Sequence, residues 1–270
     1  MKLYGATKFI HLVKDNQHIY LIGELHFLHF NQVLNTQELS DYLISKLSSQ
    51  NSKLFLELND TENVSKIKIK AKTLKNIVSV FKKKTNRFVR EKVDLYDSRE
   101  KVLREFIPKK NSINNIYSPL FYSNRVYETK IKFFNIKHIF QQCIDLWENS
   151  AISTKFYFQA RFQAFSEFYK YYENFLHHIP NKNSSLKNEI KKGLYPNKAK
   201  GLIDFTKNLL AMLQEMNLLN KLDRSKHNHN YVLIGTHHIP NIAFALNNTG
   251  WFIKTDINHK NYVLNLPDNY

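Results

Sequence analysis

The feature that most constrains this fold is a short motif, Leu-Ile-Gly-x-x-His, which occurs twice, once near each end of the chain. The first copy runs from Leu21 to His26 and the second from Leu233 to His238. Each copy completes an apolar run typical of a buried strand, which ends at the glycine. The chain has only six glycines, so two in matching positions are informative. We expect the two strands to lie side by side in one sheet, with their histidines converging on one site.

Ionisable side chains lie at or just beyond the C-terminal ends of three predicted strands, at residues 18–22, 53–58 and 231–234. This edge is where open α/β sheets hold their ligands. Two or three imidazoles with one or two carboxylates can complete a site for a divalent ion, and a further carboxylate could serve as general base. The side chains concerned are Glu24, His26, Glu57, His237 and His238.

Each of these residues also has a structural interpretation. A single histidine near a strand end more often makes structural hydrogen bonds than binds a metal. Because the motif occurs twice in matching contexts, we consider a structural role and a ligand role equally for its histidines. His29 fits a structural or supporting role better than a ligand role. Asp97 ends a further predicted strand at residues 93–97, where it could enter the site or cap the following helix. Arg99 could hold a carboxylate or phosphate through its paired donors.

The order of predicted elements indicates an α/β fold with a mixed, largely parallel sheet flanked by helices. A strand, a helix and a further strand in succession form a βαβ unit, which implies a parallel sheet covered by helices. A capping-box pattern from Asn35 to Glu38 predicts the start of the helix. The predicted elements are a hairpin of strands at residues 8–13 and 18–22, a helix at 36–49, the strand at 53–58, a helix at 240–247 and closing strands at 251–255 and 262–266.

The middle of the chain shows a different pattern. Strand signals stop there, and amphipathic periodicity predicts long helices at residues 153–178 and 199–222, the first with a thick aromatic face that fits a core better than a base-stacking platform. The polar stretch at 223–230 is expected to be a return linker in which His227 and His229 are solvated. We therefore predict an α/β core interrupted by a helical subdomain, with boundaries at residues 1–111, 112–227 and 228–270.

The formal net charge is +17, which favours an acidic partner such as nucleic acid, a phosphorylated ligand or an anionic membrane surface. The most basic stretch covers residues 66–92, from Lys66 to Lys92. Such a stretch is more often a solvated face than a binding surface, and an AT-rich coding sequence would also enrich lysine. No zinc finger, RNP motif, KH loop or P-loop supports a specific nucleic-acid module.

The single cysteine, Cys143, excludes an internal disulfide and a cysteine-rich metal site. No apolar run approaches 18 residues, so the sequence predicts no transmembrane helix, and residues 1–13 lack the features of a signal peptide. We expect a soluble, intracellular, cytoplasmic protein. The oligomeric state is left open.

In combination, the motifs resemble those of the TraB/TIKI superfamily, which includes ChaN-like and erythromycin esterase-like proteins. The stretch from Gly23 to His26 is similar to the ChaN and esterase form, in which glutamate follows the glycine, although the esterase form places its histidine one residue later. The stretch from Gly235 to His238, followed by a predicted helix and Gly250, is similar to the TraB/TIKI ending. The resemblance covers about residues 1–110 and 228–270.

This resemblance implies a site formed by His26, Glu57 and His238, with Glu24 beside them. TIKI members are metal-dependent proteases, the esterases cleave a macrolide lactone, and ChaN-like members bind haem. Our first hypothesis is a metal-dependent hydrolase of peptide or ester bonds using manganese, cobalt or zinc. Glu24 would activate water, and His237 or Arg99 would stabilise the oxyanion. A non-enzymatic binder of haem or nucleic acid, and a degenerate member acting in protein interaction, stay open as alternatives.

Overall fold

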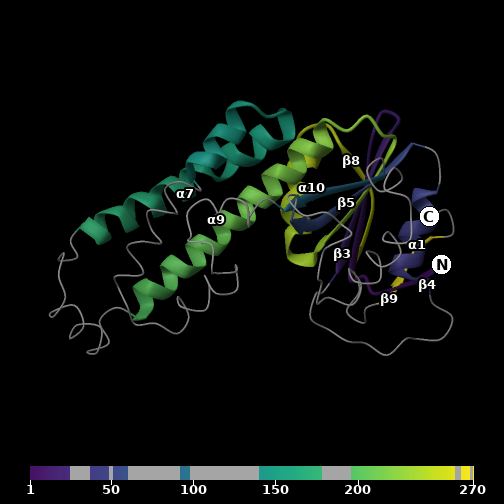
Figure 1. Cartoon of the computed structure of the whole chain (residues 1–270), viewed down its shortest axis with the longest axis horizontal. Coiled ribbons are helices and arrows are strands. Elements are labelled where there is room, and N and C mark those ends of the chain that lie inside the picture. Colours follow the sequence, from purple (N-terminus) through teal and green to yellow (C-terminus); the bar gives the residue numbers. More distant parts are fainter. Residues whose placement is uncertain are drawn as a thin grey trace. The chain divides into compact units, whose positions relative to one another are not determined.

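The structure is a computed structural model, and it describes residues 1–24, 37–48, 51–59, 92–97, 140–177, 196–258, 263–267 and 270. The chain divides into two compact units (Figure 1). Unit 1 comprises Met1–Asp97, Ala151–Ser153 and Asn217–Tyr270, and unit 2 comprises Ser98–Ser150 and Thr154–Met216. The predicted boundary after residue 111 lies outside the described residues.

Unit 1 is built on a six-stranded sheet with the strand order β6-β5-β7-β3-β2-β8. The first four strands in this order are parallel, and β2 pairs antiparallel with both β3 and β8. The prediction of an α/β fold with a mixed sheet is therefore confirmed. The strands are β2 (Lys8–Lys14), β3 (Gln17–Glu24), β5 (Ser52–Asn59), β6 (Val93–Asp97), β7 (His229–Gly235) and β8 (Phe252–Asn258).

Helices α1 (Leu39–Leu47) and α10 (Ile239–Asn247) cover opposite faces of this sheet (Figure 1). The face under α1 is apolar because alternate strand residues such as Ile22, Leu56 and Leu233 point into one buried core with the helix. The predicted helix at residues 240–247 is confirmed as α10. The prediction that a helix begins at residue 36 is wrong, since Gln37 and Glu38 form strand β4 (Gln37–Glu38) and α1 starts at Leu39.

A second sheet of three short strands has the order β4-β1-β9, with β1 (Lys2–Tyr4) and β9 (Val263–Asn265). The ladder between β1 and β4 takes up the backbone of Gln37 and Glu38, which explains the late start of α1. The predicted strand at residues 262–266 exists as β9 but pairs with β1, not with the central sheet. Reciprocal backbone hydrogen bonds between Met1 and Leu266 extend this pairing.

The long helices α7 (Ile152–His177) and α9 (Pro196–Asp223) confirm the predicted helices at residues 153–178 and 199–222. Within unit 2, Phe158 is buried, as a core role for the aromatic face predicts, whereas Phe162 is 41% exposed. The Tyr157 hydroxyl donates a hydrogen bond to buried Glu215, and burial raises the pKa of that hydroxyl. None of the helices in the described part of the chain combines the length and apolar character needed to cross a membrane.

Candidate functional site

The two copies of the motif lie side by side, because β3 and β7 are neighbouring parallel strands. Gly23 is opposite Ile234, and Glu24 is opposite Gly235. Strand β5 pairs with the other side of β7 up to Leu56, one residue before Glu57. The carboxyl ends of three parallel strands therefore meet at one edge of the sheet, as the sequence predicts.

Gly23 is required by the close packing of the next segment on β3. A Cβ atom at this position would lie 2.8 Å from the Ile239 side chain and 2.8 Å from Thr236 Oγ1. These contacts come from the 3₁₀ turn η2 (Thr236–His238) and the start of α10. Because real Cβ atoms do not approach so closely, only glycine lets the turn that carries the second histidine pair lie against the first strand.

Two threonines, neither of them among the predicted site residues, fasten this turn to the end of β3. The Thr236 hydroxyl donates to the backbone oxygen of Glu24 at 3.2 Å. The hydroxyls of Thr7 and Thr236 share a hydrogen bond of 2.5 Å, and the Thr7 backbone N–H donates to the Gly23 oxygen at 2.8 Å. Thr7 precedes β2 and belongs to no recognisable pattern, so only the fold brings it here.

Glu57 and His238 form a buried carboxylate–imidazole pair. His238 Nε2 lies 4.0 Å from Glu57 Oε1, and the side chains are 2% and 6% exposed, respectively. The backbone N–H of Gly235 donates to the other carboxylate oxygen, Oε2, at 2.8 Å. This hydrogen bond fixes the plane of the carboxylate and leaves Oε1 as the oxygen nearer His238.

His237 occupies the exposed side of the same turn. Its ring centroid lies 3.9 Å from that of His238, but His237 is solvent-exposed while His238 is buried. A Cβ atom on Gly235 would come within 3.1 Å of the His237 ring, so the second glycine of the motif leaves room for this imidazole. The site thus has a buried pair of potential ligands and an imidazole that a substrate can reach.

Glu24 is the last residue of β3 and is 1% exposed. Its position opposite Gly235 places its backbone at the edge where Glu57 and His238 meet. Among the predicted site residues, Glu24, Glu57, His237 and His238 therefore lie on strand ends or the adjoining turn at this edge.

The remaining predicted site residues are not described. His26, His29 and Arg99 lie outside the described residues, as does the side chain of Asp97, whose backbone ends β6 opposite Asn59. Of the basic stretch at residues 66–92, the structure describes only Lys92.

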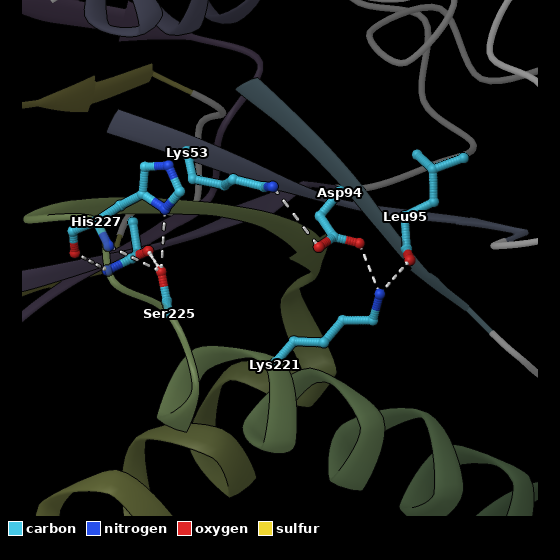
Figure 2. A network of polar contacts seen from close by, with 7 residues as sticks. Lys53, Asp94, Leu95, Lys221, Ser225 and His227 are labelled. Atoms are coloured by element: carbon cyan, nitrogen blue, oxygen red, sulfur yellow. Dashed lines mark hydrogen bonds and ion pairs between the residues drawn. The ribbon is translucent and has the colours of Figure 1, made fainter. Parts of the chain in front are cut away.

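The opposite end of the strands is held by polar contacts in which α9 takes part (Figure 2). Lys221 Nζ donates to Asp94 Oδ1 at 2.6 Å and to the Leu95 oxygen at 3.0 Å, and Lys53 Nζ lies 3.9 Å from Asp94 Oδ2. Asp94 thus forms ion pairs with both lysines, and these contacts tie the end of α9 to β5 and β6.

The predicted return linker at residues 223–230 is solvated only in part: Arg224, Lys226 and Asn228 are exposed, whereas His227 is partly buried and Asn230 is buried. Asn230 Nδ2 donates to the His227 oxygen at 3.0 Å, and the Ser225 hydroxyl donates to Asn230 Oδ1 at 2.6 Å. Burial, together with Lys53 and Lys92, lowers the pKa of His227. His229 belongs to β7 and stacks on His18, because the strand begins earlier than its apolar run.

Within the described residues, no group of three or more His, Cys, Asp or Glu side chains is arranged to hold a metal ion. In the described part of this edge, Glu57 and His238 form a pair of potential metal ligands. Comparison with protein-family models, with curated proteins and with solved structures found no match.

Proposed function

We propose that the chain is a metal-dependent hydrolase of the TraB/TIKI-like type, with a helical subdomain inserted in an α/β core, and that it cleaves a peptide or ester bond. The observation that supports the proposal best is the buried pair of Glu57 and His238 at the carboxyl edge of β5 and β7. Imidazole nitrogen and carboxylate oxygen are the ligand types that zinc, cobalt and manganese share.

The spacing of the pair is close to that of two ligands of one ion. Two ligand atoms about 2.1 Å from a tetrahedral ion lie about 3.4 Å apart. The distance of 4.0 Å between His238 Nε2 and Glu57 Oε1 would therefore have to shorten by about half an ångström when an ion binds. The Gly235 N–H supports the same arrangement, because it binds the other carboxylate oxygen, Oε2, and so helps to orient Oε1.

His26 is the proposed third ligand. It follows Glu24 by two residues, and two residues of chain span at most about 7 Å. Glu24, the last described residue before it, ends β3 beside the strand that leads to His238. A catalytic zinc site commonly uses three protein ligands and leaves one position for water or substrate.

A bound divalent ion would supply a Lewis acid that polarises the scissile carbonyl and lowers the pKa of water. The chain's own residues have separate tasks in this proposal. Glu24 accepts the proton of the attacking water, as a carboxylate outside the ligand set can do. His237, exposed beside His238, donates a hydrogen bond to the oxygen on which negative charge develops, with Arg99 as the other candidate donor.

The first test is metal binding, measured as bound metal after dialysis and as a shift in melting temperature. At a free ion concentration about 100 times Kd, binding adds about 2.7 kcal/mol to the free energy of unfolding. For a chain of this size we expect the melting temperature to rise by roughly 5–10 °C. His26→Ala, Glu57→Gln and His238→Ala should each abolish the rise, and His227→Ala, a matched histidine substitution at the opposite strand end, should retain it.

Two results would contradict the proposal. One is a wild-type protein that neither retains zinc, cobalt or manganese nor gains stability from them. The other is a Glu57→Gln variant that binds the ion as tightly as the wild type. With binding established, hydrolysis of peptide and ester substrates by wild type and Glu24→Gln separates a catalytic from a purely binding site, because Glu24→Gln should keep the ion and lose turnover.

A further inference from the structure

Three histidines from three neighbouring strands stack at the opposite end of β3 and β7 from the candidate site. We call His11, His18 and His229 the histidine ladder. The ring centroids of His11 and His18 lie 5.2 Å apart and those of His18 and His229 4.9 Å apart, with interplanar angles of 20° and 14°. Tyr20 lies against the same stack, 4.5 Å from His11 by ring centroids.

Hydrogen bonds join the ladder to a tyrosine far away in the sequence. His11 Nε2 is 2.9 Å from His18 Nδ1, and His11 Nδ1 is 2.7 Å from the Tyr270 hydroxyl. The same hydroxyl is 2.7 Å from Thr255 Oγ1 on β8. The Tyr270 ring packs edge-on against Phe9, with centroids 5.1 Å apart. Tyr270 thus closes over His11, which is 3% exposed.

The surroundings of the ladder are unfavourable for positive charge. Lys254 of β8 faces His11 and His18, and Lys46 of α1 faces His229. Lys46 Nζ also donates to the main-chain oxygen of Tyr270 at 2.7 Å. Two phenols also pack on the ladder, those of Tyr20 and Tyr270, and burial raises the pKa of Tyr20 to about 12, which keeps it neutral.

The hydrogen bonds set a limit on how many protons the ladder can take up. The bond between His11 and His18 needs one N–H and one bare ring nitrogen. A singly charged His11 can donate both to His18 Nδ1 and to the Tyr270 oxygen. A second proton, on His18 Nδ1, would place its N–H against the N–H of His11 Nε2 and break the hydrogen bond between the two rings. Charge on His11 also favours hydration of its ring, which Tyr270 excludes.

We propose that the histidine ladder is an acid-sensitive clasp: with at most one added proton the ladder holds Tyr270 against the sheet, and further protonation releases it. The clasp is independent of the candidate metal site, which lies at the other end of the strands. Release requires Tyr270 to leave its contacts with His11, Thr255, Phe9 and Lys46. The ladder histidines stay in place, because they belong to β2, β3 and β7.

The titration of the ladder sets the pH range. Burial, followed by His18, Lys254 and His229, lowers the pKa of His11 to about 4. Burial and neighbouring cations also lower the pKa values of His18 and His229. A histidine whose pKa is lowered by the closed clasp binds protons better in the open form. The closed form is therefore favoured near neutral pH and loses its advantage as the pH falls from about 6.5 towards 4.

Nuclear magnetic resonance of the full chain, with histidine and tyrosine rings labelled, tests the proposal between about pH 4 and 8. We expect the ring contacts of Tyr270 with Phe9 to disappear on acidification at the pH where the ladder histidines titrate. His11→Gln, which keeps a hydrogen-bonding group but cannot ionise, should shift the loss to lower pH by at least about half a unit. His18→Gln provides the same test if His11→Gln fails to fold, and His227→Gln is the matched control.

Three outcomes would overturn the clasp. The contacts between Tyr270 and Phe9 could persist to pH 4 in the wild type. They could be lost at the same pH in the wild type and in the foldable glutamine variant. They could also be lost only together with the β-sheet circular dichroism, which would indicate global unfolding and not local release. None of these outcomes depends on whether the candidate site binds metal.

Discussion

The two ends of β3 and β7 use the same residue type under opposite electrostatic conditions. At the carboxyl end, His238 lies 4.0 Å from the Glu57 carboxylate. At the amino end, His11 contacts another imidazole and faces Lys254. A neighbouring carboxylate attracts a cation, whereas neighbouring imidazoles and ammonium groups repel one. This contrast is why we propose a metal site at one end of the strand pair and an acid-sensitive clasp at the other.

The largest effect that we predict comes from the amino end. The pKa of His11 is lowered from 6.5 to about 4, and one unit corresponds to about 1.4 kcal/mol, so His11 accounts for a loss of about 3 kcal/mol in the free energy of unfolding between pH 7 and 4. The sign follows because the unfolded chain binds the proton more tightly. The stabilisation is complete above about pH 6.5 and is lost on the way down to about pH 4.

Urea unfolding of wild type and His11→Gln across this range measures the effect. The free energy of unfolding is plotted against pH for each protein, and the difference between the two plots should change by about 3 kcal/mol from pH 7 to 4. A difference that stays constant from pH 7 to 4 would show that His11 titrates alike in the folded and unfolded chain.

The next largest effect compares the glycines of the two motif copies. Gly23→Ala forces a Cβ to within 2.8 Å of Ile239 and Thr236, so we expect a loss of about 2 kcal/mol. Gly235→Ala meets the exposed His237 ring at 3.1 Å, which can turn away, and should cost less than about 1 kcal/mol. Equal losses, measured by urea unfolding, would mean that η2 is not packed against β3 as described.

The strand ends at the carboxyl end could be predicted because their signals are local, although His26, His29 and Arg99 lie outside the described residues. A glycine after an apolar run marks a strand end, and two copies of the motif are readily explained by adjacent strands. The βαβ order and the long helices α7 and α9 follow from periodicity in the same way. Glu57 was found because a carboxylate at the end of a predicted strand is conspicuous, even though its partner His238 is far away in the sequence.

The amino end could not be predicted because its partners meet only through sheet register. His11 reaches Tyr20 by antiparallel pairing, and His18 reaches His229 by a parallel crossover. Neither pairing leaves a spacing pattern along the chain, and His229 precedes the apolar run that marked its strand. Tyr270 and Thr7 have no motif at all. The start of α1 was misjudged for a related reason, since pairing of β4 with β1 overrides a local capping signal.

A smaller effect concerns the clasp itself. Tyr270→Phe removes the hydroxyl that bonds His11 and Thr255 while keeping the ring on Phe9. We expect a loss of about 1 kcal/mol near pH 7, the usual contribution of such hydrogen bonds. Near pH 4 the loss should shrink, because the clasp is already open. A loss that is the same at both pH values, in thermal or urea unfolding, would argue that His11 and Tyr270 are not coupled.

The smallest effect on stability is expected from Glu57→Gln, and it is the sharpest test of the contrast between the two ends. In the presence of a chelator, the amide oxygen of glutamine can still accept the Gly235 N–H, so the free energy of unfolding should change by less than about 0.5 kcal/mol. With saturating zinc, cobalt or manganese, the variant should lack the gain of about 2.7 kcal/mol expected for the wild type. His18→Gln should show the reverse pattern, with a full metal gain and an altered pH dependence. If Glu57→Gln and His18→Gln changed both properties together, the two ends of the strands would be one coupled system, and a carboxylate partner would not be what distinguishes a metal-binding histidine from a proton-sensing one in this chain.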